Sequence, residues 1–305
     1  MPFDVASWIR SRFPRAKFTS TGWARMCCPF HPDSTPSFGI HIGSGNYGCR
    51  AASCGAKGGL VRLIKEIDDL SWREAFALVD RPNPFDVDAV EDPAPAVPRP
   101  PTHNELPGFL TPVSTERFPS YLIGRGFHYD DVQPFGLLFA ESGPSRGDLF
   151  FPFWDLDGAY KTYKMRRMQE GARYADPESG LASKMLYGVW RLASTRTDRV
   201  FVVEGQFDVI RMWSLGLPAV GLSTCRTTAA QRNQLAELHH VFSLQVYIML
   251  DAGEMETESA HGIAASLSCQ GIAATVLTVP AGIKDPGELE YSHVPLILDA
   301  CNQTR

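Results

Sequence analysis

The last third of the chain has the most regular succession of apolar and polar stretches. From Val200 onward, short apolar runs rich in β-branched residues alternate with segments that we expect to be helical. The predicted helices lie over 207–213 and in TTAAQRNQLAELHH and ESAHGIAASLSCQG, and the predicted strands lie in VFVVEG, PAVGLS, QVYIMLD and AATVLTVP. Strands that alternate with helices predict a mostly parallel, Rossmann-like sheet, which binds ligands beyond the carboxyl ends of its strands.

The remainder of the chain divides into further units by the same patterns. Near the N-terminus, SFGIHI and NYGC predict short strands, and residues 59–70 predict a helix. The stretch LFFPFWDLDGAYKTYKMRRM predicts two strands around an Asp157-Gly158 hairpin turn. We therefore expect a multidomain α/β fold with a β-rich N-terminal domain, an extended proline-rich linker, an α+β middle domain and the parallel-sheet domain, over residues 1–80, 81–107, 108–198 and 199–305.

Composition limits the class of protein. A chain of 305 residues with 44% hydrophobic content can bury a core in each of about two or more domains. No apolar run reaches the roughly 18 residues that a membrane helix needs, and the charged N-terminus MPFDVASWIRSRF does not predict a secretory signal. The odd number of cysteines, 7, predicts metal ligation in a reducing cytoplasm instead of a disulfide framework.

Charge is distributed unevenly along the chain. The formal net charge is −5, but residues 1–75 hold 10 Lys/Arg against 6 Asp/Glu, whereas residues 200–305 hold 5 against 11. Local charge matters more than the total for contact with phosphates. A basic N-terminal part therefore agrees with nucleic-acid binding, and the acidic C-terminal part suits divalent cations.

One cluster of cysteine and histidine has the composition of a closed structural zinc site. Its second pair is spaced Cys-x₄-Cys, which is longer than the usual gap, and the side chains could instead be buried or free thiols. Cys27 competes with its neighbour for the first position, and His41 is an alternative ligand. The predicted zinc ligands are Cys28, His31, Cys49 and Cys54.

Acidic residues follow the predicted strands of the C-terminal domain. Glu204 and Asp251 come just after two strands, and Asp285 follows the last one, so a parallel sheet would place all three at one edge. Carboxylate oxygens suit Mg²⁺, and such a cation activates a hydroxyl in phosphoryl transfer. We expect Gly205 to allow a sharp turn and Asp208 to ligate or orient. Helix-start or solvated charges are the expected roles of Glu256, Glu258, Glu288 and Glu290.

These motifs together resemble the DnaG-type primases. Cys-Pro-Phe-His-Pro-Asp-x-x-Pro-Ser-Phe, followed by Tyr47-Gly-Cys and Cys54-Gly-Ala-Lys-Gly-Gly, is similar to that family's N-terminal zinc ribbon. Val-Val-Glu204-Gly-x-x-Asp208 and the two later acidic segments are similar to its TOPRIM domain. The segment from Tyr121 to Gly126 and that from Arg166 to Gly188 resemble its basic middle domain.

The resemblance assigns a role to each group of residues. It implies a structural Zn²⁺ and catalytic Mg²⁺ or Mn²⁺, with Glu204, Asp251 and Asp285 as catalytic residues and metal ligands, and with Lys284 in support. It also implies contacts to template or nucleoside triphosphate from Arg125, Arg146, Lys164, Arg166, Arg167, Arg173 and Lys184. Solvated surface cations are the alternative for each of these.

The chain departs from the family pattern in two places. The second acidic segment is normally Asp-x-Asp-x-Ala-Gly. Here Gly253 stands two residues after Asp251, where the family has the second Asp, so Glu254 is the expected substitute magnesium ligand. The chain ends at Arg305, before any helicase-binding domain, so we expect a separate replicative helicase as partner. A compact primase of this kind resembles those of phages or mobile elements.

The sequence thus predicts a DNA primase that joins ribonucleoside triphosphates on single-stranded DNA in a bacterial or phage-infected cytoplasm, away from membranes. A non-catalytic single-strand-binding adaptor of the replisome is one alternative, because the acidic motif is altered. A TOPRIM nuclease is the other.

Overall fold

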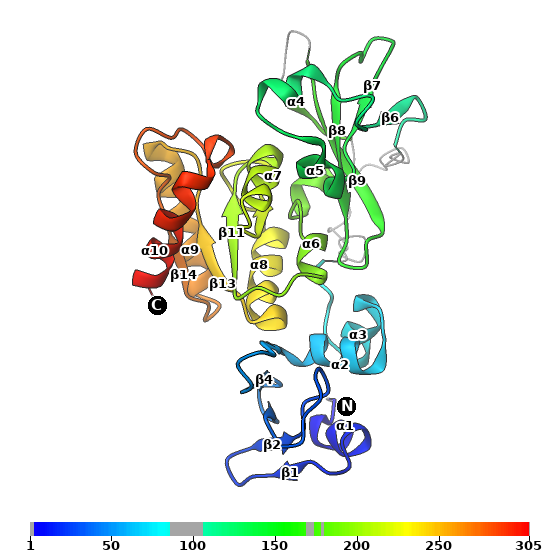
Figure 1. Ribbon diagram of the computed structural model, residues 1–305, viewed down its shortest axis with the longest axis vertical. Coiled ribbons are helices and arrows are strands. Elements are labelled where there is room, and N and C mark those ends of the chain that lie inside the picture. Colours follow the sequence, from blue (N-terminus) through cyan, green and yellow to red (C-terminus); the bar gives the residue numbers. More distant parts are fainter. Residues whose placement is uncertain (1–2, 86–105, 169–173, 178–179, 305) are drawn as a thin grey trace, which may run out of the picture. The chain divides into compact units, whose positions relative to one another are not determined.

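The computed structural model describes residues 3–85, 106–168, 174–177 and 180–304, so most of the predicted linker and Arg173 lie outside the described residues. The chain forms two compact units. Unit 1 comprises the described part of residues 1–84 with 195–198 and 235–245, and unit 2 comprises the described part of 85–194, 199–234 and 246–305. The ribbon of each unit can be followed in Figure 1.

Unit 1 is built on an antiparallel sheet with its strands in sequence order. The order is β1-β2-β3-β4-β5, with bounds Lys17–Phe18, Trp23–Met26, Phe38–His41, Tyr47–Cys49 and Lys57–Gly58. The helices are α1 (Val5–Arg12), α2 (Leu60–Asp68) and α3 (Trp72–Leu78). The predicted strands and the predicted helix over 59–70 are confirmed, while α1 and α3 were not predicted.

Buried apolar side chains hold the helices of unit 1. Helix α2 buries Val61, Leu63 and Ile64, which are all fully inaccessible. It ends where Asp69 adopts a left-handed conformation, and α3 then begins at a capping box of Ser71 and Glu74. The chain therefore leaves α2 near Asp69 and starts a second helix three residues later.

The first sheet of unit 2 is antiparallel. Its order is β10-β9-β8-β7-β6, with bounds Tyr174–Ala175, Tyr160–Arg166, Leu149–Trp154, Leu138–Ala140 and Leu110–Pro112. The predicted hairpin is confirmed: β8 and β9 pair, and Gly158 in the turn between them has φ +77°. Short helices accompany this sheet, namely α4 (Ser120–Gly124), α5 (Tyr129–Val132), η2 (Gln133–Phe135), η3 (Leu181–Lys184) and α6 (Trp190–Ala193).

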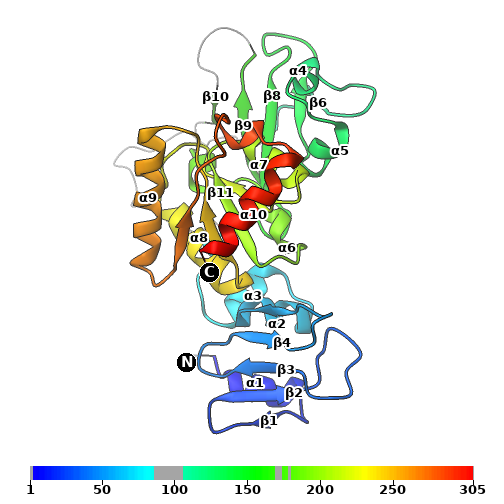
Figure 2. The same cartoon turned by 60° about the vertical axis from the view of Figure 1, so that its left-hand side comes forward.

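The second sheet contains the predicted parallel strands. Its order is β12-β11-β13-β14, with bounds Ala219–Gly221, Arg199–Val203, Gln245–Ile248 and Ala274–Val276, and both β11–β12 and β13–β14 pair in parallel. The helices are α7 (Gln206–Ser214), α8 (Ala229–Phe242), α9 (Glu254–Ser268), α10 (Val294–Gln303), η4 (Pro286–Glu288) and η5 (Tyr291–His293). Buried residues of α7 and α10 belong to one cluster with Phe201 and Tyr247, so both helices lie on the same face of this sheet, where α10 runs across the front in Figure 2.

One hydrophobic core joins the two sheets of unit 2. Phe151 and Phe153 of β8 belong to the same buried cluster as Phe201 and Val203 of β11. Phe207 of α7 packs edge-on against Phe151, with ring centroids 5.0 Å apart. The predicted middle and parallel-sheet domains therefore share one interior, so groups at the edge of one sheet are held in place by the other.

One helix boundary differs from the prediction and bears on the site. Helix α9 begins at Glu254, four residues before the predicted segment, and the N–H of Thr257 donates to the carbonyl of Gly253 at 3.0 Å. Acidic side chains in a first helical turn are favoured by the helix dipole. Glu254 and Glu256 therefore lie in the first turn of α9.

In the described part of the chain, none of the helices combines the length and the apolar character that crossing a bilayer requires.

We expect the shared core of unit 2 to be sensitive to loss of a central ring. Phe201 is fully inaccessible and stacks on Tyr247 with centroids 5.6 Å apart. Phe201→Ala should lower the free energy of unfolding by about 3–5 kcal/mol, measured by urea denaturation. The matched control Phe109→Ala removes a ring that is 56% exposed and should change stability by less than about 0.5 kcal/mol. Equal losses in both variants would contradict the described core.

Candidate metal centres and nucleic-acid interface

The four predicted zinc ligands come together in unit 1. Their donor atoms all lie within 4.8 Å of one another, and among the described residues no other group of three or more such side chains is as compact. The Sγ atoms of Cys28 and Cys54 are 3.7 Å apart, and Nε2 of His31 is 3.4 Å from Sγ of Cys49. Three thiols and one imidazole at this spacing fit a closed structural Zn²⁺ site.

One strand pairing and one turn held by an aspartate place these ligands. Cys49 ends β4 and pairs with Phe38 on β3. Asp33 secures the turn between the first two ligands: its carboxylate accepts from the N–H of Cys28 at 2.8 Å and from the hydroxyl of Ser37 at 2.6 Å. The Ser37 hydrogen bond and the backbone donors lower the pKa of Asp33 to about 2, so this acid is charged near neutral pH. Asp33 thus orients the ligand turn.

The thiols differ in their readiness to ionise. Burial raises the pKa of Cys28 to about 12. Burial would also raise the pKa of Cys49, but hydrogen bonds from Ser37, Ala51 and His31 lower it to about 6. Because zinc binds thiolates, the hydrogen bonds to Cys49 favour the ionised form of the thiol that a zinc ion requires.

The two alternative ligands lie outside the cluster. Cys27 is exposed. His41 has its Nδ1 3.1 Å from the hydroxyl of Ser44 and is not in the four-residue group. The structure therefore favours the set that begins at Cys28.

Acidic side chains converge at the carboxyl ends of the parallel strands in unit 2. Glu204 directly follows β11, Asp208 lies on the first turn of α7, Asp251 follows β13, and Asp285 precedes η4. A Cβ placed on Gly287 would lie 2.8 Å from Oδ1 of Asp208 and 3.0 Å from Oδ1 of Asp285. The cluster is more open than the zinc site, as expected of like charges that repel one another.

The electrostatic state of this cluster is unusual for acids. Burial and the neighbouring Asp251 raise the pKa of Glu204 to about 7, and the same two causes raise the pKa of Asp208 to about 7. Burial and then Asp285 raise the pKa of Asp251 to about 6. Oδ1 of Asp251 and Oδ1 of Asp285 are buried and have no hydrogen-bond partner among the described residues. Buried carboxylate oxygens without a donor are suited to a divalent cation.

Gly205 has a different role from the predicted one. Its φ is −103°, a value that any residue adopts, so the chain does not need glycine for a sharp turn. Its N–H donates to Oδ2 of Asp208 at 2.7 Å, and a Cβ on Gly205 would lie 2.8 Å from that same oxygen. The glycine therefore provides room for the Asp208 carboxylate at the start of α7.

Two arginines from the antiparallel-sheet side pack on Phe207, which neighbours Asp208 of the acidic cluster. Nη2 of Arg125 lies 3.4 Å from the same point on Gly287 that the two aspartates approach. Arg166 donates to the hydroxyl of Tyr174 at 2.9 Å, and both guanidinium groups lie over the ring of Phe207, at 4.6 Å for Arg125 and 5.7 Å for Arg166. Planar cations beside carboxylates are well placed to bind phosphate oxygens.

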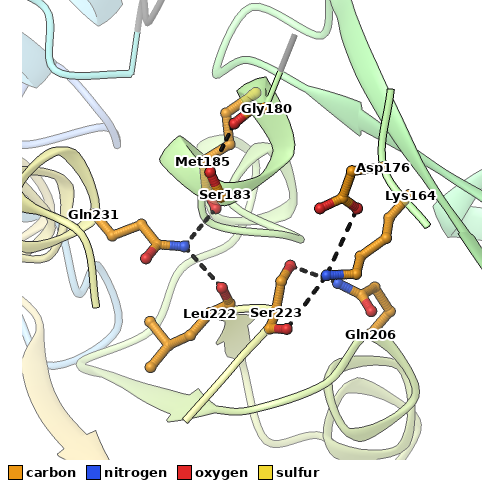
Figure 3. Close-up of polar contacts among 9 residues, drawn as sticks. All are labelled: Lys164, Asp176, Gly180, Ser183, Met185, Gln206, Leu222, Ser223 and Gln231. Carbon is orange, nitrogen blue, oxygen red and sulfur yellow. Dashed lines mark hydrogen bonds and ion pairs between the residues drawn. The ribbon is translucent and has the colours of Figure 1, made fainter. Parts of the chain in front are cut away.

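Lys164 joins the antiparallel sheet to a strand end of the parallel sheet (Figure 3). Its ammonium donates to the carbonyl of Ser223 at 3.3 Å and lies 3.6 Å from Asp176. Ser223 has φ +71°, which is rare for a residue other than glycine, and its N–H donates to the carbonyl of Glu204 at 2.8 Å. The side chain of Gln206 donates to the Ser223 hydroxyl at 2.7 Å. This network fixes the backbone of Glu204.

Sequence reasoning missed Arg211, which positions part of the site. Its guanidinium donates to the carbonyl of Arg125 at 2.8 Å and to that of Gly287 at 3.2 Å, and it lies over the ring of Phe127 at 4.5 Å. It therefore ties the loop of Arg125 to the segment that follows Asp285. Its position three residues after Asp208 on a helix is the one signal in the sequence that could have indicated it.

The other predicted cations are less closely engaged. Arg146, Arg167 and Lys284 are exposed, and Lys284 contributes to lowering the pKa of Asp251. Lys184 is partly buried in η3, where its carbonyl accepts from the side chain of Gln234 at 3.0 Å. Their contacts to nucleic acid stay predictions.

The structure favours Glu256 over the predicted substitute ligand, Glu254. Glu254 is exposed at the start of α9, whereas Glu256 is partly buried. Glu256 is among the groups that raise the pKa of both Glu204 and Asp251, and Glu254 is not. Glu256, which we expected to be a helix-start or solvated charge, is therefore the glutamate nearer to the acidic cluster.

Comparison with known proteins finds a family match for the N-terminal and for the C-terminal part of the chain. Residues 3–91 match the CHC2 zinc finger family, and residues 201–289 match the Toprim-like family. The DNA primase of Chlamydia trachomatis is 27% identical over 86% of this chain and 51% of its own length. The DNA primase of Pseudomonas putida is 27% identical over 70% of this chain and 40% of its own length. The chain spans about half the length of the curated relatives it matches.

Solved structures agree with this at the level of the fold. The zinc-binding and RNA polymerase domains of the Aquifex aeolicus primase match with a TM-score of 0.51 and 20% identity, covering 97% of this chain and 83% of that one. The RNA polymerase domain of the Mycobacterium tuberculosis primase DnaG matches with a TM-score of 0.50 and 20% identity, covering 61% and 76%.

A CHC2 zinc finger followed by a Toprim-like domain defines the class of this protein. In domain content and fold, the chain resembles the DnaG-type primases, and the predicted fold class is confirmed.

We expect zinc to depend on the four clustered ligands. Wild-type protein should contain roughly one equivalent of zinc, and Cys54→Ser should lose it together with the cooperative unfolding transition of unit 1, because structural zinc supplies folding free energy. Metal analysis and thermal denaturation measure both. The adjacent-thiol control Cys27→Ser should keep its zinc. Loss of zinc from Cys27→Ser, or its retention in Cys54→Ser, would contradict the assignment.

We expect cation binding at the acidic cluster to depend on pH near neutrality. The raised pKa values of Glu204, Asp208 and Asp251 mean that protons compete with a cation until the pH exceeds about 7. Affinity for Mn²⁺, measured by calorimetry, should therefore fall steadily from about pH 7.5 to about pH 5.5. Acids with ordinary pKa values near 4 would give an almost constant affinity over that range, and such a result would contradict the raised values.

Proposed function

We propose that this chain is a DNA primase, which joins ribonucleotides into short RNA primers on a single-stranded DNA template. The observation that carries the proposal is the set of carboxylates at the strand ends, with Arg125 beside the aspartates and with Arg125 and Arg166 both over the ring of Phe207. Nucleotidyl transfer requires positioned phosphates and neutralised charge more than covalent chemistry from the protein. The names of the curated relatives, DNA primase, support the same function.

The acidic cluster would hold the divalent cation. Glu204, Asp251 and Asp285 supply the ligand oxygens, and Asp208 is fixed beside them by the N–H of Gly205. A bound Mg²⁺ or Mn²⁺ would activate the attacking 3′-hydroxyl and neutralise charge on the leaving pyrophosphate. Arg125 and Arg166 would bind the triphosphate of the incoming ribonucleotide, while Lys164 holds the Glu204 strand end through Ser223.

The zinc-bearing unit would contact the template. Residues 1–75 carry the excess of basic residues, and the exposed cations among them include Arg10, Arg12 and Lys57. Basic side chains bind the phosphates of a single strand without regard to sequence. We propose single-stranded DNA and ribonucleoside triphosphates as ligands, a separate replicative helicase as partner, and the bacterial or host cytoplasm as the place of action.

One observation favours a second candidate, a non-catalytic adaptor that binds single-stranded DNA. Gly253 offers no carboxylate in the second acidic segment, and the nearby Glu254 is exposed. A site with too few ligands would bind nucleic acid without catalysing synthesis.

The test is formation of dinucleotides from ribonucleoside triphosphates on a random-sequence single-stranded library with Mg²⁺. Asp251→Asn should abolish synthesis, since it removes one ligand charge from the cluster while keeping the shape of the side chain. The control Glu258→Gln changes an exposed glutamate on α9 and should synthesise like the wild type.

Three results would contradict the primase assignment. Full activity of Asp251→Asn would remove the cluster from catalysis. Tight binding of single-stranded DNA by the wild type without any synthesis would select the adaptor. Cleavage of DNA with Mg²⁺ alone would select a TOPRIM nuclease.

A further inference from the structure

The space beside Gly253 is occupied by another acid. A Cβ added to Gly253 would lie only 2.1 Å from Oε2 of Glu256 and 3.1 Å from its Cδ. The carboxylate of Glu256 therefore occupies the volume in which a side chain at position 253 would begin. The missing side chain leaves room, and Glu256 fills it.

The position of Glu256 on α9 explains how it reaches that space. Helix α9 starts at Glu254, so Glu256 is the third residue of its first turn, where side chains point back toward the preceding loop. Glu256 and Asp251 both line a cavity of about 180 Å³ at the end of the parallel sheet, together with Gly253. Glu254 does not line this cavity and is exposed.

Glu256 also interacts electrostatically with the other acids. Its charge contributes to raising the pKa of Glu204 and that of Asp251. Two positive charges have the opposite effect on these pKa values. Lys164 partly offsets the rise in the pKa of Glu204, and Lys284 partly offsets the rise in the pKa of Asp251. Glu256 is thus within electrostatic reach of two predicted ligands.

A capping role is the competing explanation for this conformation. A glutamate at the third helical position often accepts a hydrogen bond from the backbone N–H of the residue that precedes the helix. In the described part of the chain, no side-chain hydrogen bond caps the start of α9. The Glu256 carboxylate therefore lies beside Gly253, in the cavity that Asp251 also lines, without a capping hydrogen bond.

We propose that Glu256 supplies the carboxylate that position 253 lacks, and that it is a further ligand of the divalent cation held with Asp251 and Glu204. The inference rests on the cation site of the proposed function. It replaces Glu254 by Glu256 as the substitute ligand.

Calorimetric titration of the full-length chain with Mn²⁺, in the absence of nucleotide, tests the assignment. Glu256→Gln keeps the size of the side chain and removes its charge, and it should weaken Mn²⁺ binding by about tenfold or more. The control Glu258→Gln should bind like the wild type. Glu254→Gln is the competing arm, and weaker binding in that variant with unchanged binding in Glu256→Gln would overturn the proposal.

A rescue variant distinguishes a lost ligand from a disturbed helix. Gly253 has φ 167°, an extended conformation open to any residue, and aspartate is favoured immediately before a helix. Glu256→Ala should bind Mn²⁺ weakly, and the double variant Gly253→Asp/Glu256→Ala should recover wild-type affinity. Failure of the double variant to exceed Glu256→Ala, with both folded by circular dichroism, would overturn the proposal.

The outcome separates this inference from the proposed function. If Glu256→Gln loses Mn²⁺ affinity but the wild type makes no primers, the ligand assignment stands and the primase proposal fails. If the wild type makes primers and Glu256→Gln binds Mn²⁺ and synthesises equally well, the primase proposal stands and this inference fails.

Discussion

The structure of unit 2 depends on holding like charges together at the ends of parallel strands. Glu204, Asp208, Asp251 and Asp285 come from separate segments, and their burial and mutual repulsion raise the pKa of the first three. Such an arrangement disfavours folding unless other groups fix it. Here the shared hydrophobic core fixes the strands, and Arg125 supplies positive charge beside the aspartates. The repulsion among these carboxylates is the property that favours a bound cation.

The antiparallel sheet helps to position the groups at the acidic cluster. Lys164 reaches the carbonyl of Ser223, whose N–H in turn holds the carbonyl of Glu204. Arg211, on the helix that follows Glu204, holds the loop of Arg125 from the other side. The two sheets therefore position each other's functional groups. A substitution in one sheet should change the geometry of the groups at the edge of the other.

Much of the fold and part of the site could be predicted from the sequence for identifiable reasons. Cysteine and histidine at short spacing indicated the zinc cluster, and buried β-branched runs each ending near an acid indicated the parallel sheet and its edge. Glu256 could not be predicted, because the start of α9 decides whether it faces solvent or Asp251. The role of Gly205 was also hidden, since only the structure gives its φ of −103° and the closeness of the Asp208 carboxylate.

The central claim is that the strand-end carboxylates form one divalent-cation site. Diffraction from crystals soaked in Mn²⁺, with anomalous scattering collected at the manganese edge, tests it most directly. The account predicts an anomalous peak within coordination distance of oxygens from Glu204, Asp251 and Glu256. Manganese peaks elsewhere on the protein, with none among these carboxylates, would contradict it.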